Sequence, residues 1–174
     1  MRRSGWLLLL CIVGFQLLMA EKYIEVTAAH ANIRTAPLKG SAKVATARKG
    51  DIFHYSGTED AWAGIILFSG QVRHIHSTLV KQVFYEPVLP KEEKAIRIFQ
   101  ALHYVEGLAR KHAASKYPLR NGDRPSNEQL KKQLERQYLL DDRYKLEVCH
   151  KYNVPPALYN PLVQTGVEQA WFKK

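Results

Sequence analysis

Hydrophobic and polar residues alternate with a period of two between Tyr23 and Val83. Such alternation is typical of β-strands, because a strand places successive side chains on opposite faces of its sheet. Turns that contain glycine, proline or aspartate separate the alternating segments. The pattern predicts about five short strands in residues 23–83, with the sequences YIEVTAA, HANIR, DIFHYS, AWAGIILF and VRHIH. We expect them to form a small closed β-barrel, since closure removes the exposed edges of a sheet.

After these strands the periodicity becomes that of an amphipathic helix. Residues 84–91, which contain two prolines, are predicted to link the two halves of the chain. Beyond them apolar residues recur every three or four positions, which indicates helices with one buried face. Ser126, followed three positions later by Gln129, predicts a capping box at the start of the second long helix. The predicted fold class is therefore α+β in two parts: a barrel in residues 23–83, then an all-α module of about three or four helices in residues 92–174.

Residues 1–20 have the features of an export leader. Two arginines, an apolar run and a small residue at Ala20 form the pattern of a cleavable secretory signal peptide. The alternative is an uncleaved membrane anchor, but the apolar run is shorter than the roughly 20 residues that a membrane-spanning helix prefers. We therefore expect a periplasmic or extracellular protein with no stable membrane insertion after cleavage. Cleavage leaves Cys149 as the single cysteine, which excludes an intrachain disulfide.

The chain is basic, with 26 lysines and arginines against 16 aspartates and glutamates and a formal net charge of +10. The basic residues are dispersed in short clusters such as Arg48-Lys49. Outside the cytoplasm a positive surface meets envelope phosphates, acidic lipids and the carboxylates of wall peptides. A nucleic acid is not expected as a partner in that compartment.

One stretch, AHANIRTAPLKG at residues 29–40, combines an extended Asn-Ile-Arg with a proline that ends the strand. Further along the chain a glycine occupies the second hairpin, a tryptophan precedes the next strand, and a glycine opens the last turn. This ordered series over residues 23–83 resembles the bacterial SH3-like (SH3b) domain. The matching residues are Asn32, Ile33, Arg34, Pro37, Gly50, Trp62 and Gly70.

The resemblance implies a secreted module that binds peptidoglycan or another envelope protein and performs no catalysis. One departure concerns the end of the family pattern. Arg73-His74 stands there in place of a Gly-Trp pair, so an aromatic surface that the family often uses is altered. Residues 84–174 resemble no family that we recognise.

Five side chains of the predicted barrel are candidates for ligand binding: Asn32, Arg34, Tyr55, Trp62 and His74. Aromatic rings stack on sugars and peptides, and an arginine forms charge-assisted hydrogen bonds with carboxylates. The alternative for Trp62 is that it closes one end of the barrel core. The expected ligand is a peptidoglycan peptide or an envelope protein.

The sequence predicts no catalytic residue. Cys149 and His150 are adjacent, so on a helix their side chains point roughly 100° apart and do not face each other. A cysteine peptidase that cuts wall peptides would also need a histidine downstream of its cysteine, and His150 is the last histidine of the chain. Cys149 is therefore interpreted as a half-buried structural residue.

Metal and acid–base sites are not predicted either. His74 and His76 share one face of a strand and could bind zinc with His54, but no cysteine pair or carboxylate in motif spacing supports them. Adjacent carboxylates such as Asp141-Asp142 are expected at turns or helix starts, and nothing selects a catalytic pair. We expect no metal and no cofactor. Two alternatives stay open: a cell-wall hydrolase with a catalytic centre in the helices, and a structural or stress-linked envelope protein without a small ligand.

Overall fold

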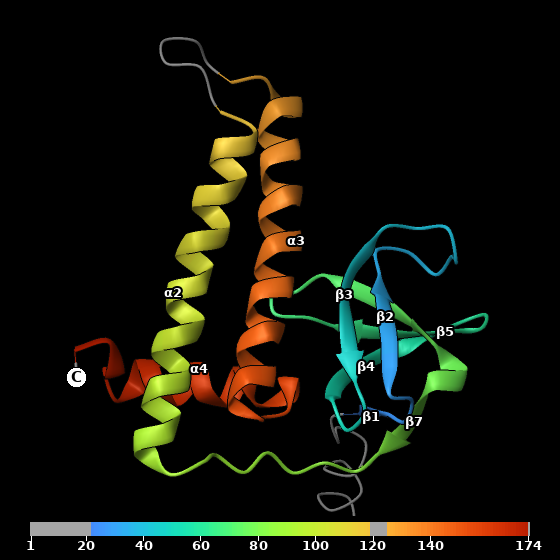
Figure 1. The fold of residues 1–174 in the computed structure, drawn as a ribbon, viewed down its shortest axis with the longest axis horizontal. Helices are drawn as coiled ribbons and strands as arrows, with labels where there is room; N and C mark the ends of the chain where they lie inside the picture. The colour runs from blue at the N-terminus through green and yellow to red at the C-terminus, as the bar shows by residue number, and fades with distance from the viewer. Residues whose placement is uncertain (1–21, 119–124, 174) are drawn as a thin grey trace, which may run out of the picture.

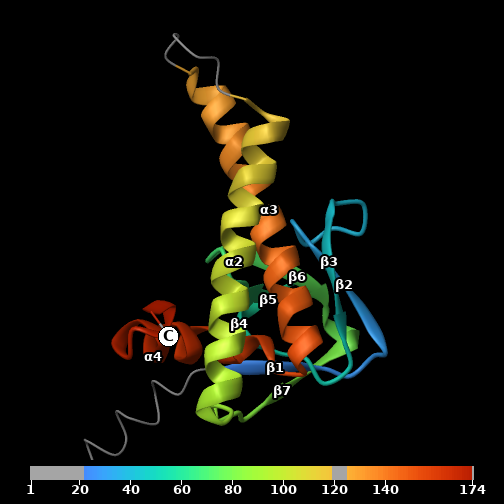
Figure 2. The same cartoon turned by 60° about the vertical axis from the view of Figure 1, so that its left-hand side comes forward.

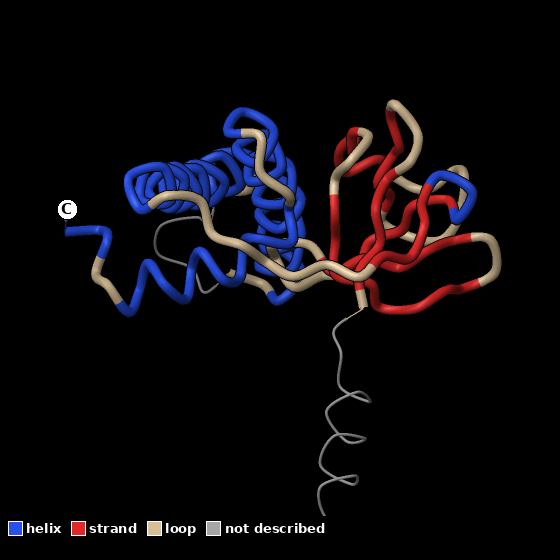
Figure 3. Tube along the Cα trace, turned by 90° about the horizontal axis from the view of Figure 1, so that it is seen from below, coloured by secondary structure: helices blue, strands red, loops and turns tan. Residues whose placement is uncertain are grey.

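The structure is a computed structural model that describes residues 22–118 and 125–173. It consists of an antiparallel sheet followed by a group of helices, which confirms the predicted α+β fold in two parts (Figure 1). Helices and strands gather on opposite sides of the molecule, and residues 84–91 cross between them without forming either element (Figure 3). The predicted signal peptide, residues 1–20, lies outside the described residues.

The sheet has seven strands rather than about five. The two strands that the alternation missed, β3 and β7, lie at its edges. β3 is rich in small alanines and β7 has only four residues, two of them polar, so neither carries a strong alternating signal. The strands are β1 (Tyr23–Val26), β2 (His30–Arg34), β3 (Lys43–Arg48), β4 (Ile52–Glu59), β5 (Trp62–Ile66), β6 (Val72–His76) and β7 (Val80–Val83), in the sheet order β3-β2-β6-β5-β4-β1-β7.

The closed barrel that we predicted is not formed by the described strands. The two edges, β3 and β7, make no ladder with each other. The sheet curls instead, and helix α3 (Asn127–Tyr152) packs beside the edge strand β3 (Figure 2). A helix laid along an edge strand protects that strand from pairing with other chains. Helix α3 therefore protects one of the two edges that barrel closure would have removed.

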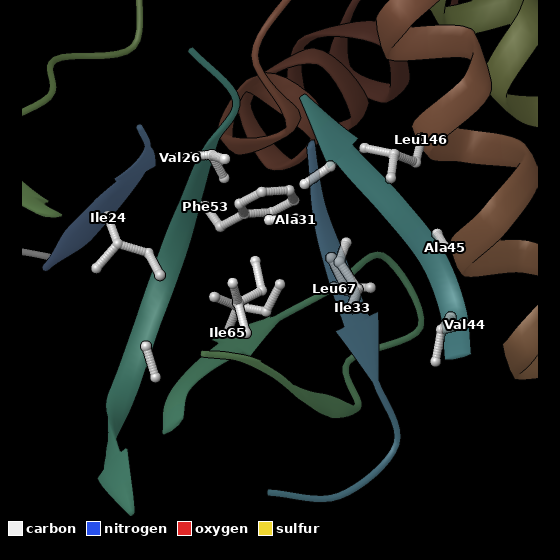
Figure 4. Packing of buried hydrophobic residues seen from close by; sticks show 13 residues of the cluster. Ile24, Val26, Ala31, Ile33, Val44, Ala45, Phe53, Ile65, Leu67 and Leu146 are labelled. Carbon is white, nitrogen blue, oxygen red and sulfur yellow. The ribbon is translucent and has the colours of Figure 1, made fainter. Parts of the chain in front are cut away.

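The core inside the curled sheet includes one residue of the helical half. Ile24 and Phe53 belong to this core, which is made almost entirely by the strands and the turns that follow them (Figure 4). Leu146 joins it from α3 and lies beside Ala45 of β3 (Figure 4). A second core, around Phe99, forms between the helices and again includes residues of α3. Helix α3 therefore contributes to both cores.

Two long helices form a hairpin that extends beyond the sheet (Figures 1 and 2). They are α2 (Glu92–Lys116) and α3, and the short helix α4 (Tyr159–Glu168) packs against the base of the hairpin. The predicted capping box is present at the start of α3. The Ser126 hydroxyl accepts a hydrogen bond from the Gln129 N–H, and the Gln129 side chain accepts one from the Ser126 N–H.

Asp141 and Asp142 lie inside the continuous helix α3, so our prediction of a turn or helix start there was wrong. Both are buried because each meets a cation. Asp141 Oδ2 lies 2.9 Å from Nζ of Lys145, one helical turn further on. Asp142 points to the sheet, where its Oδ2 lies 3.0 Å from both Nη2 and Nε of Arg73. Its Oδ1 accepts a hydrogen bond of 2.9 Å from the Ser69 N–H.

Gly166 of α4 lies against the ring of Phe99, and this contact predicts the sign of a substitution. A Cβ atom added at Gly166 would lie 2.4 Å from Phe99 Cδ2, so the buried ring would have to move. We predict that Gly166→Ala lowers the free energy of unfolding by about 1–3 kcal/mol, measured by urea denaturation. Gly107→Ala in α2 is the matched control, because no atom lies within 4 Å of the added Cβ. The control should gain about 1 kcal/mol, as helical alanine does over glycine. An equal gain at Gly166 would contradict the packing.

Candidate ligand-binding groove

A groove opens where strands β2 and β6 diverge. The two strands pair at a single position, with Arg34 opposite His74. Beyond this pair β2 forms its ladder with β3 only, while β6 runs on into the short 3-10 turn η1 (Ser77–Leu79). The groove has a volume of about 650 Å³. This value falls within the roughly 300–1,000 Å³ that is usual for small-ligand pockets.

Alternation along β2 places three polar side chains in this groove. His30, Asn32 and Arg34 point away from the core because Ala31 and Ile33, between them, point into it. Among the described residues no carboxylate lines the groove, so the charge of its walls is positive. The other lining residues are Pro37, Leu38, Lys39, Trp62, His76 and Leu79.

The indole of Trp62 is held by His76 on the neighbouring strand. The two residues are directly opposite in the β5–β6 ladder, and their ring centroids lie 5.3 Å apart with the planes at 74°. His76 Nδ1 lies 2.9 Å from the Thr78 hydroxyl oxygen, which fixes the imidazole in turn. Trp62 is half-buried and does not belong to the core of the sheet, so it lines the groove rather than closing the core.

Arg34 has a structural contact as well as a place in the groove. Its Nη1 donates a hydrogen bond of 2.6 Å to the Ser41 carbonyl, at the far end of the loop between β2 and β3. A guanidinium carries five N–H donors, so this bond leaves others for a ligand. The same side chain therefore braces the loop that carries Pro37, Leu38 and Lys39 and presents a positive charge to the groove.

Tyr55 and His74 do not line this groove. The Tyr55 ring packs against the core of the sheet and its hydroxyl is hydrogen-bonded to the Thr58 hydroxyl. His74 lies beside the groove, opposite Arg34, and its Nδ1 is buried without a hydrogen-bond partner among the described residues. Burial lowers the pKa of His74, although the nearby Glu59 opposes this shift, so the imidazole favours its neutral form. The structure thus brings together Asn32, Arg34 and Trp62 of the five predicted residues.

Leu38 and His76 are among the groove residues that the sequence analysis did not predict. Leu38 is 64% exposed in the loop after Pro37, where a large apolar side chain is uncommon, and this signal was available in the sequence. His76 stands opposite Trp62 only because of the strand register, which no local pattern specifies.

Cys149 and His150 face different surroundings, as their helical positions predicted. The Cys149 thiol is fully buried rather than half-buried as we predicted, and burial raises its pKa to about 12, so it stays protonated at neutral pH. His150 Nε2 lies 2.8 Å from Asp51 Oδ2, and the same oxygen accepts a hydrogen bond from the Arg48 N–H. The contact between His150 and Asp51 joins α3 to the turn after β3 and does not activate the Cys149 thiol.

A buried polar cluster in the helices also fails to offer a free base. Lys145 Nζ lies 2.9 Å from the Tyr159 hydroxyl and 2.9 Å from Asp141 Oδ2, with Glu106 Oε2 at 3.4 Å. Burial alone would lower the pKa of Lys145, but hydrogen bonds with Tyr159 and Asp141 outweigh it and raise the pKa. A lysine held in its charged form by three acceptors cannot accept a proton at neutral pH. Its charge offsets that of the buried carboxylate.

No set of three histidine, cysteine or carboxylate side chains in residues 22–118 and 125–173 is arranged to hold a metal ion. In the same part of the chain no helix has the length and apolar character needed to cross a membrane.

Comparison with protein-family models, with curated proteins and with solved structures finds no match. The resemblance to the SH3b domain therefore stays a prediction.

Proposed function

We propose that the protein is a secreted, non-catalytic binding protein of the cell envelope. Its groove would recognise a carboxylate-bearing peptide of peptidoglycan, or a similar segment of an envelope protein. The observation that carries this proposal is the meeting of Asn32, Arg34 and Trp62 in one groove that no described carboxylate lines. Asn32 and Arg34 come from the opening of the SH3b-like pattern and Trp62 from its tryptophan position, and the resemblance points to the same class of ligand.

Each of the three side chains contributes a different interaction. The Trp62 indole provides a stacking surface for a sugar ring or a peptide bond. The Arg34 guanidinium forms charge-assisted hydrogen bonds with a carboxylate, and Lys39 adds a second positive charge at the rim. The Asn32 amide can donate to and accept from a peptide group. This combination suits a short peptide with a free carboxylate better than a purely apolar ligand.

We predict that Trp62→Ala weakens binding to purified peptidoglycan sacculi by about thirtyfold, because tryptophans in such sites commonly contribute about 2 kcal/mol. The measurement is co-sedimentation of the protein with sacculi over a range of sacculus concentrations. Tyr104→Ala is the matched control, since Tyr104 is an aromatic residue 71% exposed on α2, away from the groove. The control should bind as the unchanged protein does.

The binding reaction also has a spectroscopic signature. Trp171 is buried in the helical core, whereas Trp62 is half-buried in the groove. A soluble wall peptide should therefore change the fluorescence of the unchanged protein but not that of the folded Trp62→Ala variant. Equal sacculus binding by both proteins would refute the groove as the site. Release of soluble fragments from dye-labelled sacculi would refute the non-catalytic assignment.

A further inference from the structure

A second groove lies at the seam between the two halves, where β3 and α3 run side by side (Figure 1). We call it the seam groove. Its volume is about 480 Å³, and a smaller hollow around Asp51 continues it. Arg48 and His150 line both hollows. The charged and titratable lining residues of the seam groove are His30, Lys43, Arg48, Arg143, Glu147 and His150.

Basic residues stand at both ends of this groove. Lys43 and Arg48 begin and end β3, and a five-residue step along a strand spans roughly 16 Å. On the opposite wall Arg143 Nε donates a hydrogen bond of 3.3 Å to the Val44 carbonyl, which places Arg143 near the Lys43 end. His150, two helical turns further along α3, lies at the Arg48 end beside Asp51.

The seam groove carries more positive than negative charge, with three exposed cations against one carboxylate among its lining residues. Lys43, Arg48 and Arg143 are exposed, and none of them forms an ion pair with a carboxylate in the described residues. Glu147 is the one carboxylate among the residues that line it. Like charges held together in a concave site raise the local potential and attract a counter-ion of opposite sign. Their convergence from two elements without a partner indicates an external anion.

We propose that the seam groove binds a polymer of phosphodiesters that carries no bases. The positive ends are too far apart for one phosphate group, so the ligand must carry several charges along its length. The guanidinium groups of Arg48 and Arg143 match the oxygens of phosphate groups, and a phosphodiester backbone repeats such groups along its length, so β3 and α3 can each bind one of them. No tryptophan, tyrosine or phenylalanine among the described residues lines the groove, so it lacks the stacking surface that nucleic-acid bases would use.

The test uses the purified protein and a soluble poly(glycerol phosphate) oligomer. We expect the double variant Arg48→Gln/Arg143→Gln to bind the oligomer at least about tenfold more weakly. Each lost phosphate contact should also make the plot of log affinity against log salt shallower by about 0.7–0.9, so the slope falls by roughly 1–2. The single variant Arg48→Gln should fold normally, because no hydrogen bond or ion pair of the described structure uses the Arg48 side chain. Weaker binding by this variant could therefore not be attributed to misfolding.

The matched control is Lys94→Gln/Lys111→Gln, which removes two exposed charges from α2 and leaves the seam groove unchanged. It should lose less than about twofold in affinity, and Trp62→Ala should bind the oligomer normally. An equal loss in the control would overturn the proposal, because net charge alone would then explain binding. Tighter binding to polyglutamate would overturn a phosphodiester as the recognised group, and tighter binding to a DNA oligonucleotide of equal charge would overturn a polymer without bases. Binding to phosphatidylglycerol vesicles but not to the oligomer would replace the polymer with a membrane surface.

Discussion

Asp142→Asn is expected to lower the free energy of unfolding by about 3–5 kcal/mol, the usual effect of breaking a buried ion pair by removing one charge. Asp142 is fully buried and joins α3 to the sheet through Arg73 and the Ser69 N–H. The substitution leaves the Arg73 guanidinium buried without its counter-charge and weakens the acceptor of the Ser69 N–H. Chemical denaturation followed by circular dichroism measures the change.

Two further variants separate this explanation from others. Glu135→Gln removes a carboxylate at an exposed position of the same helix and should change the stability by no more than about 0.5 kcal/mol. Arg73→Met/Asp142→Leu replaces the buried pair with apolar side chains and should recover much of the lost stability, because neither charge is then left alone. A double variant as unstable as Asp142→Asn would show that the pair supplies something other than mutual charge compensation.

Leu146→Ala is expected to destabilise the protein by about 2–5 kcal/mol, the range for removing a large apolar side chain from a packed core. Leu146 is 2% exposed and is the one fully buried residue that α3 contributes to the core inside the sheet, with the partly buried Leu139 packed against it. Its removal would leave a cavity between β3 and α3, beside Ala45 (Figure 4). Urea denaturation monitored in parallel by far-ultraviolet circular dichroism and by tryptophan fluorescence measures the loss.

Leu134→Ala is the matched control, because Leu134 is the same residue type on the same helix but is 44% exposed. Its loss should stay below about 1 kcal/mol. Coincident transitions of the two probes in Leu146→Ala would indicate that sheet and helices unfold together. A loss no larger than that of Leu134→Ala would mean that the sheet does not depend on α3.

Features that depend on nearby residues were predictable from the sequence. Alternation identified β2 and the strands in the middle of the sheet, and the spacing of Ser126 and Gln129 identified the start of α3. The outward direction of Asn32 and Arg34 followed from the inward direction of Ile33. Each of these properties is set by the geometry of one strand or one helical turn, so a short window of sequence contains it.

The edge strands could not be predicted from a short window of sequence. The alanines of β3 carry little intrinsic strand preference, and the strand forms because it pairs with β2 and packs against α3. The same packing explains the open, curled sheet, since α3 lies along the edge that barrel closure would have used. A local pattern specifies a strand but not which distant segment will cover it.

Arg73 is the clearest example of a residue whose position only the contact between the two halves of the chain explains. It stands where the SH3b pattern has a glycine, and the sequence alone offers no reason for a buried arginine on the core face of a strand. Its partner, Asp142, is 69 residues away on a helix that was expected to break at that position. A buried charge is stable only with its counter-charge, and the fold alone brings the two together.

The sequence by itself determined the class of the fold, the order of its two halves and which face of β2 carries polar side chains, because strand and helix periods act over a few residues. Tertiary structure decided that the sheet stays open with Leu146 of α3 packed into its core, that Trp62 meets His76 beside Arg34, and that Arg48 faces α3 across the seam groove. These contacts depend on strand register and on helix packing between distant segments. No short stretch of the chain determines the strand register or the helix packing.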